Sequence, residues 1–201
     1  MQRKNKYLLF AIVTAFVLAS AVSILGFISR AEELRGQVLR LHVLANSNSA
    51  EDQALKLLVR DALLEAGGEL FSGATSLGNA AERLAENQAV LQKAGEDCIR
   101  ENGKSYAFSV SIVSEYFGTR SYGELTLPAG EYLAIKAVIG EGEGQNWWCV
   151  MFPPLCLPAA QAEPEEYFES GTLSLIESNP KIELRFKIVE LFEEMKLKWF
   201  G

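Results

Sequence analysis

The spacing of apolar residues predicts strands and helices from residue 37 onward. Segments that alternate apolar and polar positions are typical of strands, and they occupy residues 37–46, 106–113, 131–139 and 146–152. Segments with apolar residues three and four positions apart are typical of helices, and they occupy residues 50–66, 79–102 and 179–201. This order indicates an α+β fold, a single domain with a mixed or antiparallel sheet of about four strands covered by helices.

Short polar and glycine motifs predict where the helices begin and end. Asn48 and Glu51 are spaced as a capping box before the first helix, and Gly67-Gly68 is a typical helix end. Asn79 is the expected cap of the second helix, and Asn179-Pro180 is a favourable start for the last one. The glycine-rich residues 140–144 join two predicted strands, so we expect a hairpin loop there rather than a phosphate site.

The stretch from Asn146 to Cys156 is apolar on both faces of its predicted strand. Trp148, Val150 and Phe152 should point to one side, and Trp147, Cys149 and Met151 to the other. A strand of this kind is usually covered on both faces, so core packing is the leading interpretation. The tandem tryptophans beside a rigid Pro-Pro corner leave an interaction surface as the alternative.

The N-terminal segment predicts export or membrane anchoring. Residues 7–29 carry no charge, and they follow Arg3, Lys4 and Lys6. Their length suits a membrane-spanning helix, which needs about 20 residues, whereas Ala19-Ser20-Ala21 resembles a signal-peptide cleavage site. Both alternatives place the following domain outside the cytoplasm.

Composition narrows the classes of function. Hydrophobic residues make up 49% of the chain, which is enough for a core, and the formal net charge is −7. An acidic body does not favour nucleic acid or anionic lipid, so membrane contact is expected through residues 7–29 only. The scattered cysteines and one histidine have no metal-ligand spacing, and the sequence predicts neither metal nor cofactor.

The sequence also allows two other classes of protein, a hydrolase and a cell-wall-binding module. In a thiol- and histidine-dependent hydrolase, His42 would be the base and Cys149 the nucleophile, oriented by Asn46 or Asp61. An apolar strand disfavours a thiolate, which argues against this site. In a cell-wall-binding module the two tryptophans would stack on sugars, but neighbouring strand residues face opposite ways. No catalytic residue is therefore assigned.

Three motifs resemble the stage II sporulation protein R family. They are Asn146-Trp147-Trp148-Cys149-Val150-Met151-Phe152-Pro153-Pro154-Leu155-Cys156, the stretch from Arg40 to Ser47 followed by 52–61, and the stretch from Leu127 to Tyr132. The resemblance implies a non-enzymatic signal protein made in the forespore and exported into the space between the two sporulation membranes. It implies a membrane-bound aspartic protease of the mother cell as partner, whose activation leads to processing of a sporulation sigma-factor precursor.

Polar residues inside these motifs are the candidate contacts with that protease, because core packing explains only their apolar neighbours. The strand should present Arg40, His42 and Asn46 on one face, and the following helix should present its polar side chains outward. The candidate contacts are Arg40, His42, Asn46, Gln53, Lys56, Arg60, Asp61 and Trp147.

The three cysteines allow at most one internal disulfide. Cys98 lies on the apolar stripe of a predicted helix, which leaves Cys149 and Cys156 as the candidate pair. The alternative is two small buried thiols that only fill space.

The expected organisation has four parts. It consists of a signal peptide or anchor over 1–30, a signalling domain over 37–156, an acidic linker over 157–178 and an amphipathic helix over 179–201 that packs on the core.

Overall fold

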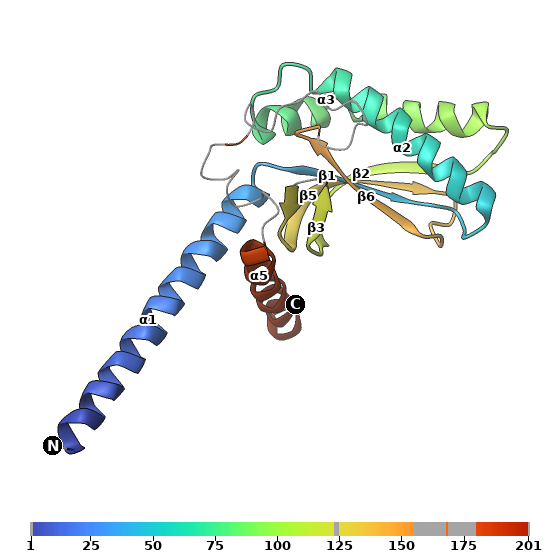
Figure 1. The fold of residues 1–201 in the computed structure, drawn as a ribbon. Helices are drawn as coiled ribbons and strands as arrows, with labels where there is room; N and C mark the ends of the chain where they lie inside the picture. Colours follow the sequence, from blue (N-terminus) through green and yellow to red (C-terminus); the bar gives the residue numbers. More distant parts are fainter. Residues whose placement is uncertain (1, 123–124, 155–167, 169–179, 201) are drawn as a thin grey trace.

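A four-stranded mixed sheet forms the centre of the molecule (Figure 1). The computed structural model describes residues 2–122, 125–154, 168 and 180–200. The strands lie in the order β2-β5-β1-β6, with β1 parallel to β5 and antiparallel to β6, and β2 antiparallel to β5. Their bounds are β1 Leu39–Leu44, β2 Phe108–Phe117, β5 Gly130–Ile139 and β6 Asn146–Phe152. The expected α+β fold is therefore confirmed, and the sheet is mixed.

Helices α2, Ala50–Leu70, and α3, Leu77–Glu101, cover one face of the sheet (Figure 1). The odd-numbered residues of β1 point to this face, where Leu41 and Val43 are fully buried. Gly67 of α2 lies so close to Met151 of β6 that an added Cβ would come within 2.4 Å of the methionine Cε. The helices and the sheet thus enclose the first hydrophobic core.

The opposite face of the sheet has a core of its own. It is covered by the end of α1, Gln2–Arg35, by α5, Pro180–Phe200, and by a small hairpin of β3, Arg120–Tyr122, and β4, Leu125–Leu127. The sequence pattern did not predict this hairpin. The buried side chains of this core come from α1, α5, β4, the sheet itself and two positions outside these elements: Phe27, Leu34, Val38, Phe117, Leu127, Tyr132, Ala134, Val150, Phe168, Phe186 and Val189.

Two covered faces explain why β6 is apolar on both sides. Trp148 and Val150 belong to the second core, and Cys149 and Met151 belong to the first, as the alternation predicts. Phe152 does not follow the pattern, because the pairing with β1 shifts by one residue between Leu39 and Arg40. The resulting bulge turns Phe152 toward the helices, and the expectation for this residue was wrong.

The loop of residues 140–144 is not a hairpin loop. It joins β5 to β6, and these strands lie on opposite sides of β1. The loop therefore crosses the end of β1, where the backbone N–H of Glu143 donates to Asn46 O and that of Gly144 to Ala45 O. An added Cβ on Gly144 would lie 2.2 Å from Ser47 O, so this crossing has no room for a side chain.

The N-terminal helix α1 is longer than the expected anchor. It continues through the charged residues after position 29, and Ala31 and Leu34 are fully buried against the domain. Arg35 at its end is also buried; its Nη1 donates to Ala129 O at 2.8 Å and its Nη2 bonds Glu193 Oε1 at 3.1 Å. Leu9–Arg35 is long and apolar enough to cross a membrane, a property that signal sequences near the N-terminus share.

Three helix boundaries differ from the expected ones. Ser49, not Asn48, caps α2 by accepting from Asp52 N, and Ser76, not Asn79, caps α3. The helix α2 also continues past Gly67 to Leu70. Gly67 is needed for its close contact with Met151 rather than as a helix end.

The C-terminal helix α5 buries only part of its apolar stripe. Phe186 and Val189 are in the second core, with the ring of Phe186 5.6 Å from that of Phe27. Phe192, Met195 and Trp199 are exposed, which corrects the expectation that this whole stripe packs on the core. Except for Phe168, the expected acidic linker over 157–178 lies outside the described residues, as does Asn179.

Candidate functional site

The sheet divides the predicted contact residues among three places. Arg40 and His42 point to the second core, on the side away from α2 and α3. Asn46, Gln53 and Lys56 take part in hydrogen bonds around the N-terminus of α2. The remaining three lie together at the outer surface of α2 and β6: Arg60, Asp61 and Trp147.

Arg40 is fully buried in a cage of aromatic rings. Its guanidinium carbon lies 4.3 Å from the ring centroid of Phe117, 4.8 Å from that of Tyr132 and 5.4 Å from that of Tyr122. Nη2 donates to Tyr122 Oη at 2.7 Å, whereas Nε and Nη1 have no partner among the described residues. Burial lowers the pKa of Arg40 and raises that of Tyr122. Ring faces thus provide most of the cation's surroundings.

His42 is held between a ring and a carboxylate. Its imidazole stacks on the indole of Trp148 at 3.7 Å between centroids, and Nδ1 donates to Glu115 Oε2 at 2.8 Å. Glu115 also accepts from Lys136 Nζ at 2.8 Å. Burial alone would raise the pKa of Glu115, but the hydrogen bonds from Lys136 and His42 outweigh it and leave this pKa below its ordinary value. Lys136, Glu115, His42 and Trp148 therefore link all four strands on this face.

The hydrolase hypothesis is incompatible with this geometry. His42 pairs with Trp148 and shares its face, whereas Cys149 pairs with Leu41 and belongs to the core under the helices. The imidazole of His42 and the sulfur atom of Cys149 thus lie on opposite faces of the sheet. Neither Asn46 nor Asp61 orients His42, because that role belongs to Glu115.

Asp52 is the centre of a hydrogen-bond network that joins α2 to the sheet. Its carboxylate accepts from Asn46 Nδ2 at 2.8 Å, Ser47 Oγ at 2.6 Å and Tyr106 Oη at 3.0 Å. These hydrogen bonds, that from Ser47 first, lower the pKa of Asp52 to about 2. Asn46 follows β1 instead of belonging to it, and its side chain turns to the helix, so it does not share the face of Arg40 and His42.

Lys56 was expected to face outward but is buried. Its Nζ donates to Gln53 Oε1 at 2.6 Å and to Gln145 O at 3.0 Å. Burial lowers its pKa, and the nearby charge of Arg60 adds to this effect. Gln53 in turn donates to Ser47 O at 2.8 Å. Lys56 thus joins α2 to the loop before β6, and Gln53 joins α2 to the turn after β1.

The Trp147 patch, defined as Arg60, Asp61 and Trp147, contains the two exposed residues of the predicted set, Asp61 and Trp147, and the partly exposed Arg60. The guanidinium of Arg60 lies 4.4 Å above the indole of Trp147, and its Nη2 is 2.7 Å from Asp61 Oδ1. Trp147 is 36% exposed and the Asp61 side chain 56% exposed. An aromatic ring with a cation over it and an anion beside it is a composition typical of binding hot spots.

Sequence reasoning missed several residues that hold these sites together. Glu115 falls beyond the predicted end of its strand at 113, although β2 continues to Phe117. Tyr122 lies in the unpredicted hairpin, and Arg35 lies between the predicted anchor and the first predicted strand. The apolar alternation could have been extended to Phe117, but no local signal pairs Glu115 with His42 across 73 residues.

The cysteines differ in their state. Cys149 is buried and disulfide-bonded, whereas Cys98 is a free thiol whose pKa is raised by burial and then by the charges of Glu101 and Asp61. Cys156 lies outside the described residues, so its pairing with Cys149 stays a prediction.

Fold and site together define an α+β domain behind one long apolar helix, with cations and aromatic rings arranged on both sides of β6. The sequence profile described as stage II sporulation protein R (spore_II_R) matches residues 35–162, and this chain belongs to that family. The chain is 38% identical over 120 residues to the stage II sporulation protein R of Bacillus subtilis (strain 168). That alignment covers 60% of this chain and 54% of the relative. No solved structure matches the chain.

Proposed function

We propose that this chain is an exported sporulation signal protein that activates a membrane-bound aspartic protease of the mother cell by direct contact. Activation of that protease leads to processing of a sporulation sigma-factor precursor. The observation that carries the proposal is family membership over residues 35–162, which contain β1, α2 and β6. The apolar helix α1 supports export, since it suits a signal sequence or an anchor.

In this proposal the Trp147 patch is the surface that touches the protease. A contact residue must reach the partner: Asp61 and Trp147 are exposed and Arg60 is partly exposed, whereas Arg40, His42 and Lys56 are almost fully buried. The cation–π contact and the ion pair hold Arg60 in place before binding. Such preorganisation reduces the side-chain entropy lost when a complex forms.

The buried residues of the predicted contact set support the Trp147 patch by holding α2, β1 and β6 in place. Asp52 fixes α2 to the turn after β1, Lys56 fixes it to the loop before β6, and Arg60 of the same helix lies over Trp147. His42 and Arg40 hold the other side of the same two strands. We therefore expect substitutions at these buried positions to weaken signalling through loss of stability rather than through loss of contact.

Co-purification tests the proposed contact. The full chain in detergent micelles would be mixed with the extracytoplasmic part of the protease and recovered through an affinity tag. We expect the wild-type chain and Arg100→Ala to be retained, and Trp147→Ala and Arg60→Ala to be lost. Arg100 is a matched control because it is an exposed arginine that pairs with Asp97 within α3 and is not a member of the patch. Failure of the wild-type chain to bind would contradict the proposed function.

A further inference from the structure

Strand β2 forms one edge of the sheet, and only alternate residues turn their backbone groups toward β5. Ala107 O accepts from Gly140 N, so position 107 is hydrogen-bonded to the β5 side. In an antiparallel pair such positions alternate. The N–H and C=O groups of the even-numbered residues of β2 therefore point outward, away from the sheet: Phe108, Val110, Ile112, Ser114 and Tyr116.

The first half of this edge is closed by side chains of α3. Gln92 accepts from Val110 N at 2.9 Å and donates to Phe108 O at 2.8 Å. Gln88 donates to Val110 O at 2.7 Å. These two amides imitate the backbone of a neighbouring strand, so no further strand can pair there.

The second half of the edge is open. No described residue makes a hydrogen bond to the outward backbone groups of Ile112, Ser114 or Tyr116, and Ser114 is exposed. A row of unpaired N–H and C=O groups is a template for an added strand, which is one of the recurring ways in which proteins bind extended peptides. Within the part of the chain that the structure describes, side chains thus protect only the first half of this edge.

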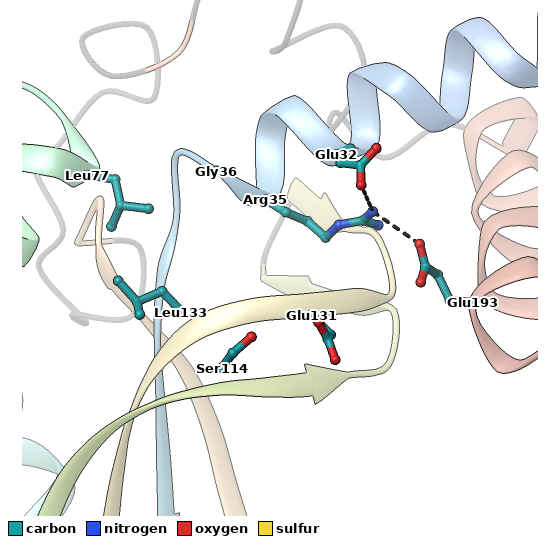
Figure 2. Close-up of a pocket in the computed structure, with 8 residues that line it drawn as sticks. All are labelled: Glu32, Arg35, Gly36, Leu77, Ser114, Glu131, Leu133 and Glu193. Atoms are coloured by element: carbon teal, nitrogen blue, oxygen red, sulfur yellow. Dashed lines mark hydrogen bonds and ion pairs between the residues drawn. The ribbon is translucent and has the colours of Figure 1, made fainter. Parts of the chain in front are cut away.

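An acidic pocket lies beside the open edge (Figure 2). It has a volume of about 310 Å³, and Ser114 of the edge strand is one of its lining residues. Arg35 in this pocket pairs with Glu193 at 3.1 Å and with Glu32 at 4.0 Å, so its single charge is set against three carboxylates, and the exposed Glu131 lies outside these ion pairs. At the neighbouring Tyr116, burial and then the charges of Glu190, Glu194 and Glu193 raise the pKa of the phenol.

We propose that the edge of β2 from Ile112 to Tyr116 binds an extended segment of a partner protein, with a lysine or arginine side chain of that segment entering the acidic pocket. The open backbone groups supply the strand pairing, and the excess of carboxylates in the pocket, with Glu131 outside the ion pairs of Arg35, selects the basic side chain. A second copy of this chain is a poor occupant, because edge-to-edge pairing would bring two acidic pockets together in a chain of net charge −7. That the segment belongs to the membrane protease rests on the proposed function.

Synthetic peptides test the edge without the protease. The probe is a fluorescent eight-residue peptide that alternates lysine with threonine, compared with a version N-methylated at every second residue and a version with glutamate in place of lysine. Binding to the full chain in detergent micelles is measured by anisotropy. Ser114→Pro removes one outward N–H at an edge position where proline is tolerated, and Ser114→Ala keeps it.

We expect the lysine peptide to bind wild type and Ser114→Ala equally and Ser114→Pro about tenfold more weakly, since backbone pairing is lost. The N-methylated and glutamate peptides should bind at least about tenfold more weakly than the lysine peptide. Glu131→Lys should weaken binding more than Glu143→Lys, an equal charge change on an exposed residue outside the pocket.

Three results would overturn the proposal: equal binding of the lysine and N-methylated peptides, equal effects of the two glutamate substitutions, or a dimer in sedimentation that Ser114→Pro dissociates. If Ser114→Pro unfolds, the N-methylated peptide and the glutamate variants decide the question alone. Protease co-purification is a separate measurement, so a failure of peptide binding at the β2 edge can be distinguished from a failure of the proposed function.

Discussion

His42 and Trp148 stack face to face across β1 and β6, with their ring centroids 3.7 Å apart and their planes inclined by 14°. The two residues are directly paired in the antiparallel register of these strands. The stack places the sole histidine of the chain inside the framework, beneath a tryptophan of its most distinctive motif. A histidine in this position supports the sheet instead of touching a partner.

Removal of this imidazole should therefore destabilise the domain. We expect His42→Ala to lower the free energy of unfolding by about 1–3 kcal/mol, because Glu115 loses a partly buried hydrogen bond and Trp148 loses its stacking partner. His42→Phe keeps a ring over Trp148 and should recover part of this loss. Urea unfolding of the full chain in micelles provides the measurement, and an unchanged midpoint for His42→Ala would show that the stack is not structural.

The pH dependence of stability should reveal Asp52. Its pKa in the folded chain is about 2, below the ordinary 3.8, so its contribution is complete above about pH 4 and is lost as the pH falls toward 2. Asp52→Asn removes this ionisation, and its stability should change less over the same interval. Tyr106→Phe removes one hydrogen-bond donor to the Asp52 carboxylate and should reduce the acid sensitivity of stability less than Asp52→Asn does. Equal acid sensitivity of Asp52→Asn and the wild type, measured by urea midpoints between pH 5 and pH 2, would refute this role.

Thiol labelling should separate the three cysteines. In the unfolded but unreduced chain, iodoacetamide should modify Cys98 alone, because Cys149 is disulfide-bonded and Cys156 is its predicted partner. In the folded chain the raised pKa of Cys98 should make this reaction slow at neutral pH. Peptide mapping decides the pairing: alkylated Cys149 and Cys156 without prior reduction would exclude the bridge.

Much of the fold could be predicted from local periodicity. The alternation in β1, β5 and β6 defined their extent to within about two residues, and the apolar run around Trp147 and Trp148 correctly indicated a strand covered on both faces. The opposite directions of the two tryptophans followed from the strand geometry. Trp147 contacts the guanidinium of Arg60, and Trp148 stacks on the imidazole of His42.

The wrong predictions concern residues whose surroundings are set by partners far away in the sequence. Gly67 reads as a helix end from its neighbours alone, yet Met151, 84 positions later, explains why a glycine stands inside α2. Phe152 left its expected face because of a bulge set by the pairing with β1. The burial of Lys56 depends on the carbonyl of Gln145 in another loop. None of these partners leaves a periodic signal in the sequence.

Substitutions in the Trp147 patch should separate contact from stability. The Arg60–Trp147 contact is partly exposed, so Trp147→Ala should cost only about 1 kcal/mol of folding free energy. As the proposed hot spot it should weaken protease binding by tens of times or more. Trp199→Ala, which removes an 81% exposed tryptophan of α5, is the matched control and should bind normally. If the two variants lost protease binding equally, the loss would follow from removing any exposed tryptophan, and this would contradict the role of the Trp147 patch.

Processing of the sigma-factor precursor is the most direct measure of the central claim that this chain activates the protease through the Trp147 patch. The protease and the precursor would be co-expressed in a host without other sporulation proteins, with the full chain exported from the same cells. The account predicts cleavage with the wild-type chain and with Trp199→Ala, and background cleavage without the chain or with Trp147→Ala at equal protein level. Cleavage that is independent of the chain, or equal with Trp147→Ala and the wild type, would contradict it.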